Sequence, residues 1–511
     1  MKNAFTKVIS KVFSRVTIVA VLVLLQIVWL FNTFWALSQY AVWVNAALTL
    51  LSVLMVLYLI RKDLNSAYKI AWILLCCLMP LFGGAMYLLF GDKRPGRRMR
   101  RRIETVQQQH ISALGQADGV LEQLDARERT LARYLNHCGP SPAWDHTASR
   151  YYPSGEAVFD QMLADLEQAK HFIFVEFFII SEGRMWRSVY DVLCRKAQAG
   201  VDVRVIYDDV GSAPALPKHL IQDLEHHGIR CIPFNPMIPL LAIVMNHRDH
   251  RKILVVDGYV GYTGGINLAD EYINEKSRFG YWKDVAVRLE GAAVWNLTVM
   301  FLNMWNAFRP TDERYDAFRP AQNSHTMPPT DGIVQPYTDS PLDEERLAEN
   351  VYLDMISQSV DYLYIFTPYL IIDNEMLNLL RLAAKRGVDV RIGVPAIPDK
   401  KIVYRLTRSY FPPLLKAGVK IYTFTPGFLH AKCFVSDDRQ AVVGTVNLDY
   451  RSLYLHFEDG VLFSGCRMVA DVKKDCLDTF AQSHLVELKE CRDSFLGSLL
   501  DDLLRLFSPL L

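Results

Sequence analysis

The sequence of 511 residues is poor in cysteine and has no cysteine pairing pattern. Its nine cysteines are scattered and include no CxxC pair, so no zinc-binding spacing can be built from them. We interpret them as mostly buried thiols in a reducing compartment. The chain does not lack apolar residues: 51% are hydrophobic and only 22% are charged, which excludes an intrinsically disordered protein.

The chain also has almost no net charge, but its value of +1 hides a strong division. Residues 1–102 contain 14 Lys and Arg but only Asp63 and Asp92, a net charge of +12. The remainder has 42 basic against 53 acidic residues, a net charge of −11. This large acidic part argues against a nucleic-acid-binding protein. The basic residues lie where the chain is most apolar, which indicates a membrane surface.

Three long apolar runs precede residue 91, namely Val16–Leu37, Ala41–Ile60 and Ile70–Phe90. Each is long enough for a hydrocarbon core of about 30 Å at about 1.5 Å per residue. The sequence therefore predicts two or three transmembrane helices and a basic juxtamembrane cluster over residues 1–102. A cleaved signal peptide is the alternative for the first run, but that run is long and no small-residue cleavage pattern follows it.

The sidedness of this anchor depends on how many runs span. If all three span, seven positive charges flank each side and the positive-inside rule decides nothing. If the first run lies in the interface or re-enters, eleven positive charges lie on one side of the membrane and three on the other. The positive-inside rule then places both ends of the anchor in the cytoplasm. We favour a cytoplasmic catalytic part.

Beyond a polar helical connector predicted at 103–148, the sequence repeats itself in two units, 149–325 and 326–511. Each unit predicts an amphipathic helix, a β-branched and aromatic strand, a second helix and a further strand that begins with GVDVR. The matching segments are Gly200–Arg204 and Gly387–Arg391, and each glycine is expected to end a helix. The pattern predicts an α/β fold of two repeated units in a pseudo-twofold arrangement, with a site shared between them.

Each unit carries one copy of an HxKxxxxD motif, followed by a glycine-rich turn and an asparagine. The residues are His250, Lys252, Asp257 and Asn267 in the first copy, and His430, Lys432, Asp437 and Asn447 in the second. Histidine and lysine two residues apart on a strand project from the same face. That arrangement suits a phosphate, because Lys and Asn can hold the oxygens while His reaches phosphorus. Each copy offers one histidine and no carboxylate cluster, so we predict no metal and no cofactor.

The duplicated motif resembles that of the phospholipase D superfamily. More narrowly, the stretches "NHRDHRKILVVDGYVGYTGGINLADEY", "YWKDVAVRLEG", "PGFLHAKCFVSDD" and "VGTVNLDYRSLYLHFE" resemble the bacterial cardiolipin synthases, as does the apolar "AWILLCCLMPLFGGAMYLLFG". The resemblance implies that one motif histidine attacks phosphorus to form a phosphohistidine, while the other donates and accepts the proton. By resemblance His250 is the nucleophile and His430 the acid and base; the reverse assignment stays open.

The resemblance assigns roles to the remaining site residues as well. Asp284 and Glu458, at matching positions after the two asparagines, would each hydrogen-bond a catalytic histidine and fix its tautomer. Asp257 and Asp437 are expected to support the fold around the site. Thr445 stands where the first copy has Gly265, a variation that puts little in doubt.

The implied reaction is phosphatidyl transfer between two phosphatidylglycerol molecules, which gives cardiolipin and glycerol. The expected partners are these two lipids in a bacterial cell membrane, reached by a multi-pass anchor, and no nucleic acid. A membrane-bound phospholipase D, or a phosphatidyltransferase that uses another alcohol, is the alternative. A nuclease is disfavoured because the soluble part is acidic, and an inactive scaffold is disfavoured because both motifs are intact.

Four other features carry weaker signals. Glu176 lies in an otherwise apolar predicted strand, which is costly unless it has a partner. The apolar, proline-broken segment Cys231–Asn246 precedes His250 and suggests either a lipid entrance or core packing. His247 has no counterpart in the second copy, so we set it aside. Basic residues around Tyr410 suggest either headgroup binding or an ordinary amphipathic helix; they are Arg405, Arg408 and Lys416.

Overall fold

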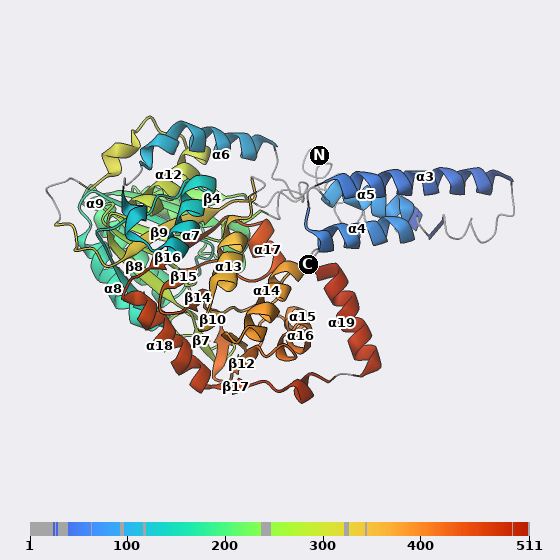
Figure 1. The fold of residues 1–511 in the computed structure, drawn as a ribbon. Coiled ribbons are helices and arrows are strands. Elements are labelled where there is room, and N and C mark those ends of the chain that lie inside the picture. The colour runs from blue at the N-terminus through green and yellow to red at the C-terminus, as the bar shows by residue number, and fades with distance from the viewer. Residues whose placement is uncertain are drawn as a thin grey trace, which may run out of the picture. The chain divides into compact units, whose positions relative to one another are not determined.

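The computed structural model describes residues 24, 25, 27, 28, 39–62, 64–91, 97–115, 119–236, 247–320, 326–342, 345–492 and 494–508. These residues form two compact units. The first contains the described residues before 97 together with 494–508, and the second contains 97–236 and 247–492 (Figure 1). Most of the predicted run Val16–Leu37, and residues 237–246 of the possible lipid entrance, lie outside the described residues.

The first unit is helical, with α3 (Gln39–Arg61), α4 (Ser66–Leu78), α5 (Pro80–Phe90) and α19 (Phe495–Phe507). The third apolar run, expected as one helix, is two. The break falls at Met79 and Pro80, because proline has no N–H to continue a helix and its ring clashes with the preceding turn. The two short helices pack against each other, and the rings of Trp72 and Tyr87 meet edge to face at 5.3 Å.

The prediction of transmembrane helices is wrong for the part of the chain that the structure describes. No helix there combines the length and the apolar character needed to cross a membrane. The reason is clearest for the third run, where α4 has 13 residues and α5 has 11, against about 20 needed for a span.

The second unit contains two large sheets. The first sheet has seven strands in the order β1-β8-β6-β5-β2-β3-β4. The pairs β2–β3 and β3–β4 are parallel and the others are antiparallel. The strands are β1 (Thr147–Tyr152), β2 (Phe172–Phe177), β3 (Asp202–Asp208), β4 (Arg230–Phe234), β5 (Lys252–Val256), β6 (Val260–Gly264) and β8 (Ala286–Gly291).

The second sheet repeats this topology. Read from β9, its order is β9-β16-β15-β14-β10-β11-β12, with β17 added at the end. The pairs β10–β11 and β11–β12 are again parallel. The α/β repeat predicted from the sequence corresponds to these two sheets. The strands are β9 (Ile333–Asp339), β10 (Tyr362–Phe366), β11 (Asp389–Pro395), β12 (Lys420–Phe424), β14 (Cys433–Ser436), β15 (Gln440–Gly444), β16 (Glu458–Ser464) and β17 (Ser483–Leu485).

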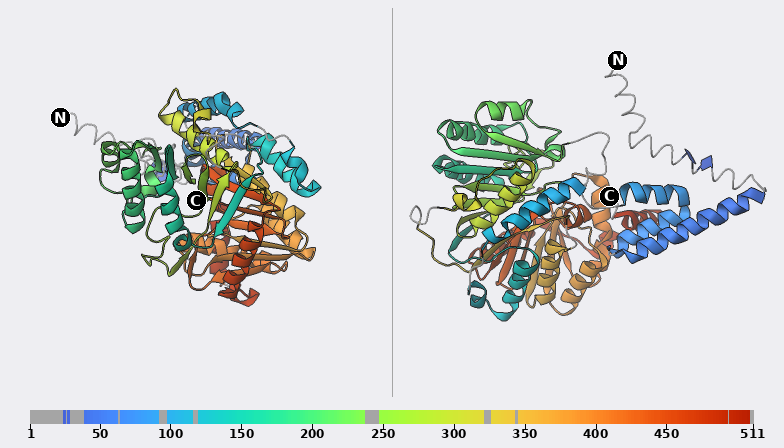
Figure 2. Two further views of the ribbon diagram at one scale, coloured as in Figure 1. Left: turned by 90° about the vertical axis from the view of Figure 1, so that its left-hand side faces the viewer. Right: turned by 90° about the horizontal axis from the view of Figure 1, so that it is seen from above.

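Two equivalent helices connect the sheets. Helix α12 (Val294–Phe308) follows β8 and packs on the first sheet, and α18 (Met468–Ala481) follows β16 and packs on the second (Figure 2). Each also contacts the outermost first strand of the other repeat, α12 with β9 and α18 with β1. Nearly every residue of α12 is buried, which its continuous apolar sequence explains.

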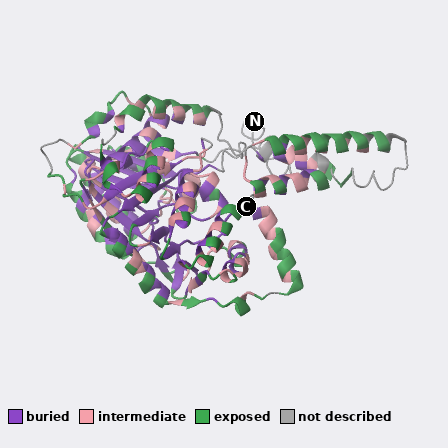
Figure 3. Cartoon of the chain, in the orientation of Figure 1, coloured by how far each residue is buried: buried purple, intermediate pink, exposed green. Residues whose placement is uncertain are grey.

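Further helices surround the sheets, and the strands between them are buried (Figure 3). The predicted glycine ends are confirmed: Gly200 follows α9 with φ +90°, and Gly387 follows α14 with φ +98°. The predicted connector contains α6 and α7, joined by 3₁₀ turns. The helices are α6 (Arg97–His110), α7 (Ala126–Cys138), α8 (Gly155–Gln168), α9 (Arg184–Gln198), α10 (Asp209–Ser212), α11 (Leu220–His226), α13 (Leu347–Gln358), α14 (Asn374–Lys385), α15 (Lys401–Ser409), α16 (Phe411–Leu415) and α17 (Tyr450–Tyr454).

Candidate active site

The backbone holds each motif histidine against the opposite repeat. The N–H of His250 donates to the carbonyl of Phe457 at 2.9 Å, next to a parallel bridge between Asp249 and Phe457. In the matching place, the short strands β13 (Gly427–Leu429) and β7 (Tyr281–Lys283) pair in parallel. The N–H of His430 then donates to the carbonyl of Lys283 at 2.7 Å. Each repeat therefore helps to position the histidine of the other.

The side chain of each motif histidine also contacts an acid of the opposite repeat. Nδ1 of His250 lies 2.8 Å from Oε2 of Glu458, and Nδ1 of His430 lies 2.6 Å from Oδ2 of Asp284. An ionised carboxylate at this place accepts the Nδ1 proton, so the Nε2 lone pair is left for chemistry. One histidine and one acid from each repeat thus form two matching pairs, as expected for residues that fix a tautomer.

Burial sets the protonation states of this site. It lowers the pKa of His250 to about 3 and that of His430 to about 4, although the facing carboxylates oppose the shift. Burial also raises the pKa of both acids, but the ammonium of Lys432 and the ring of His430 outweigh it at Asp284, and His250 outweighs it at Glu458. The pKa of each acid therefore lies below its usual value. At neutral pH both carboxylates are ionised and both imidazoles are neutral.

The two motif lysines lie beside their histidines and are almost fully buried. Nζ of Lys432 is 2.8 and 3.0 Å from the two ring nitrogens of His430. Nζ of Lys252 donates to the backbone carbonyl of His250, and Lys432 makes the same contact with His430. Burial lowers the pKa of Lys252 to about 8 and that of Lys432 to about 7. Two such desolvated amines favour an anionic ligand, whose charge stabilises their protonated forms.

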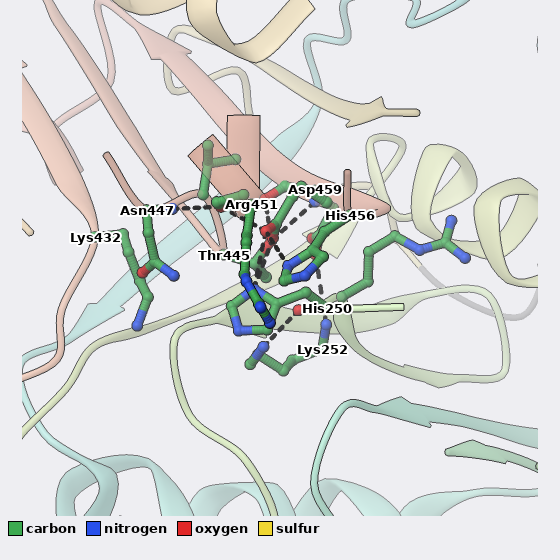
Figure 4. Close-up of polar contacts among 12 residues, drawn as sticks. His250, Lys252, Lys432, Thr445, Asn447, Arg451, His456 and Asp459 are labelled. Carbon is green, nitrogen blue, oxygen red and sulfur yellow. Dashed lines mark hydrogen bonds and ion pairs between the residues drawn. The ribbon is translucent and has the colours of Figure 1, made fainter. Parts of the chain in front are cut away.

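The two asparagines differ in their surroundings. Oδ1 of Asn267 accepts the N–H of Ile179 at 3.0 Å, and its Nδ2 donates to the hydroxyl of Tyr272 at 2.6 Å. Oδ1 of Asn447 is buried and accepts no hydrogen bond from the described residues. Figure 4 shows Asn447 next to Lys432 at one side of the site. That both asparagines hold phosphoryl oxygens stays a prediction.

The aspartates of the motif have matching contacts away from the histidines. The carboxylate of Asp257 accepts the backbone N–H groups of residues 170–172, each at 2.8 Å. That of Asp437 accepts those of residues 360–362 at 2.8 to 2.9 Å. Asp257 follows β5 and Asp437 follows β14, at the strand ends opposite the histidines. They tie the loops that lead into β2 and β10, so they support the equivalent second strands of the two repeats.

The exchange of Gly265 for Thr445 has a structural reason that the sequence did not reveal. A Cβ atom at Gly265 would lie 1.9 Å from Oδ1 of Asp284. Thr445 instead donates its hydroxyl to Oε2 of Glu458 at 2.5 Å. The glutamate is one methylene longer than the aspartate. Glycine is therefore matched to aspartate in one half, and threonine is matched to glutamate in the other. The exchange of Gly265 for Thr445 thus has a structural consequence.

We expect Gly265→Ala to lower transfer activity by about 100-fold, because a displacement near 1 Å of a catalytic group can cost this much. The new methyl group would push the Asp284 carboxylate away from His430. Initial rates and the unfolding temperature should be compared with those of Gly84→Ala, where nothing lies within 4 Å of the added Cβ. A Gly265→Ala enzyme as active as this control would contradict the matched-pair explanation.

The sequence pattern missed three residues because the other copy has a different residue type at each matching position: Tyr272 of the first copy matches Ser452 of the second, and His456 of the second matches Trp282 of the first. Ser452 donates its hydroxyl to Oε1 of Glu458 at 2.5 Å. The ring of His456 lies 5.6 Å from that of His250, and its Nδ1 lies 3.6 Å from Oε1 of Glu458 (Figure 4). Tyr272 meets the ring of His430 edge to face at 5.7 Å.

Among the described residues, His250, His456 and Glu458 are the three whose ligand atoms lie close enough, within 4.8 Å of one another, to hold a metal ion. The oxygens of Glu458 already accept hydrogen bonds from His250, Thr445 and Ser452. A metal ion would have to displace the Nδ1 proton of His250. The hydrogen bonds account for this cluster without an ion.

The two residues that flank His250 in sequence are charged, whereas those that flank His430 are apolar. Arg251 contacts Glu176 at 2.5 Å and Asp249 at 3.0 Å, so the buried glutamate singled out in the sequence has an ionic partner. The second copy has Leu429 and Ala431 at the positions of Asp249 and Arg251. Nδ1 of His247 lies 3.0 Å from the carbonyl of Leu455.

Comparison with known proteins decides the family. A family model described as the PLD-like domain of cardiolipin synthase matches residues 162–281 and again 352–478. A second, described as the phospholipase D–nuclease N-terminal segment, matches residues 50–91. The chain belongs to the cardiolipin synthase family of the phospholipase D superfamily. The prediction of a phosphatidyltransferase is thereby confirmed.

Individual relatives cover nearly the whole chain. The cardiolipin synthase of Geobacillus sp. (strain WCH70) is 34% identical over 88% of this chain and 90% of its own length. Cardiolipin synthase 1 of Bacillus anthracis is 32% identical over 91% of this chain and 93% of its own. An uncharacterized protein of Streptococcus mutans is 44% identical over 89% of this chain.

One solved structure shares the fold. It is the crystal structure of the phosphatidylserine synthase of Haemophilus influenzae, with a TM-score of 0.57 and 16% identity. The match covers 75% of this chain and 98% of that one.

Proposed function

We propose that this protein joins two phosphatidylglycerol molecules into cardiolipin and glycerol through a phosphohistidine intermediate. The observation that carries the proposal is the pair of crossed contacts, His250 with Glu458 and His430 with Asp284. Each gives a neutral imidazole whose Nδ1 faces a carboxylate, and Nε2 of His430 also lies 3.0 Å from Nζ of Lys432. Two such groups in one site suit a displacement in which one attacks and the other moves protons.

In the first step Nε2 of His250 attacks the phosphorus of one phosphatidylglycerol. The N–P bond forms, the bond from phosphorus to the headgroup oxygen breaks, and the departing glycerol takes a proton from His430. Binding of the anionic phosphodiester between Lys252 and Lys432 raises the proton affinity of the buried groups around it, which is how His430 acquires that proton. The lysines also neutralise charge that develops on the phosphoryl oxygens.

In the second step a terminal hydroxyl of another phosphatidylglycerol attacks the phosphorus. His430 takes the hydroxyl proton, the N–P bond breaks, and cardiolipin leaves with His250 restored. Over the two steps together one phosphodiester replaces another, so the overall reaction is close to balanced and should run backwards when glycerol is supplied.

The lipid alcohol must react with the phosphohistidine faster than water does, although water is roughly 55 M in bulk. Positioning can supply the advantage, because effective molarities of well-oriented groups reach about 10⁵ M or more. His250 and His430 are only 6% and 8% exposed, which limits the approach of solvent to the intermediate. The cytoplasmic side predicted for this site stays a prediction.

Purified protein given phosphatidylglycerol vesicles in the presence of EDTA should release cardiolipin and glycerol in equal amounts. Added glycerol should slow net cardiolipin formation and convert supplied cardiolipin into phosphatidylglycerol. Mass spectrometry of the lipids, with His250→Ala protein as the blank, measures both directions. Phosphatidic acid as the main product at every glycerol concentration would identify a hydrolase instead.

A further inference from the structure

Exposed basic and apolar residues gather around the start of α15, the helix labelled in Figure 1. Ile402 is 63% exposed and Ile397 is 40% exposed, although both are large apolar side chains. Exposed cations lie on the same chain segment, at 400 and 401, and on the segment before Gly280, at 276 and 278. We call this the α15 patch and define it as Lys276, Arg278, Ile397, Lys400, Lys401 and Ile402.

The four charged residues that define the α15 patch are cations, and Glu275, the exposed acid that precedes Lys276, contacts Arg184. Helix α15 contains no acidic residue, and the nearest one in sequence, Asp399, accepts a hydrogen bond from the hydroxyl of Tyr369 at 2.6 Å. Within the described chain, none of the four cations of the patch forms an ion pair; they are Lys276, Arg278, Lys400 and Lys401. The patch is therefore complementary to an anionic surface.

The two segments of the patch meet at Gly280. A Cβ atom there would lie 3.4 Å from Cδ1 of Ile397. The next residue begins β7, whose last residue, Lys283, accepts the backbone N–H of His430. On the α15 side, Nζ of Lys400 lies 5.6 Å from the ring centroid of Tyr369. The hydroxyl of Tyr369 donates to Asp399, the residue before Lys400. The patch thus borders the His430 side of the site.

We propose that the α15 patch docks on the anionic headgroup layer of a phosphatidylglycerol-containing bilayer and presents the acceptor lipid to the His430 side. The identity of the acceptor rests on the proposed function, but the docking itself does not. Exposed isoleucines enter the headgroup boundary while the cations meet the phosphates. Each Lys or Arg near such a surface strengthens the attraction by about fivefold at low salt.

A photoreactive side chain tests docking directly and without reference to activity. The photocrosslinking residue p-benzoylphenylalanine should be placed at Ile402 in one protein and, as the matched control, at Leu477 on α18, which is 36% exposed. With vesicles of phosphatidylglycerol and phosphatidylcholine, irradiation should attach lipid at position 402 and at least tenfold less at 477. Equal yields at the two positions, or no lipid at 402, would overturn the proposal. Crosslinking at 402 by protein that makes no cardiolipin would refute the proposed function alone.

Charge variants test whether docking serves the reaction. The triple variant R278Q/K400Q/K401Q removes three positive charges from the patch, and K218Q/K385Q/K474Q removes three exposed lysines elsewhere. Rates should be measured on phosphatidylglycerol vesicles and on dissolved short-chain phosphatidylglycerol. We expect the patch variant to lower the ratio of vesicle rate to dissolved rate by about 100-fold, from about fivefold per charge. High salt should reduce the difference between the two variants in this ratio of rates. A ratio equal to that of the control variant would overturn the proposal.

Discussion

Replacing His250 with alanine should lower cardiolipin formation by about 10⁴-fold or more, and His430→Ala should do the same. The reason is that when residues act as a unit in covalent catalysis, the loss of one removes most of the activity of the whole unit. The structure supports this coupling. Each histidine is paired with an acid from the other repeat, at 2.8 Å for His250 and 2.6 Å for His430. Neither repeat then retains a complete site. Comparable turnover by either single variant would contradict a shared site.

A substrate with an easy leaving group separates the two roles. Phosphatidyl-p-nitrophenol needs no proton donor for its departure, so His430→Ala should still release one equivalent of nitrophenol and then stall. His250→Ala should release none. Peptide mapping at neutral to alkaline pH, where the N–P bond survives, should find the phosphatidyl group on His250 in the stalled protein. An adduct on His430 would reverse the assignment, and unfolding temperatures close to that of the unaltered protein would show that both variants fold.

The second large effect concerns the acids. We expect Asp284→Asn and Glu458→Gln to lower activity by about 10² to 10⁴-fold, because an amide in place of the carboxylate permits the wrong imidazole tautomer. Both acids are fully buried and held ionised. Glu349→Gln is the matched control: it also removes a buried carboxyl group, but one that bonds Tyr454 and no motif histidine. It should lose far less activity.

The pH profile distinguishes this positioning role from a general loss of structure. Burial lowers the pKa of His250 to about 3, and Glu458 is the main influence that raises it. Without that carboxylate the pKa of His250 must fall further, so the nucleophile stays unprotonated to lower pH. The acid limb of kcat/KM, which reports groups of the free enzyme, should therefore move to lower pH in Glu458→Gln. An acid limb that does not move, or a rate near that of the unaltered protein, would contradict the assigned role of Glu458.

The apolar runs show how composition alone can mislead about length. Ile70–Phe90 contains no charge, and counting apolar residues predicts one long helix. Pro80 divides it into α4 and α5, which fold back and pack their aromatic rings together. That proline was visible in the sequence, and the rule that it interrupts a helix was available. Whether the two halves would separate or pack depended on contacts such as that between Trp72 and Tyr87.

The sequence by itself determined the repeat, the strand between the histidine and the aspartate of each motif and the glycine ends after α9 and α14, because all of these depend on neighbours within a few residues. Only the tertiary structure decided the partners of the histidines. His250 meets Glu458 across 208 residues and His430 meets Asp284 across 146, so no local spacing records either contact. The same holds for the match of Gly265 to Asp284, which rests on a space that exists only once β6 and β8 lie side by side.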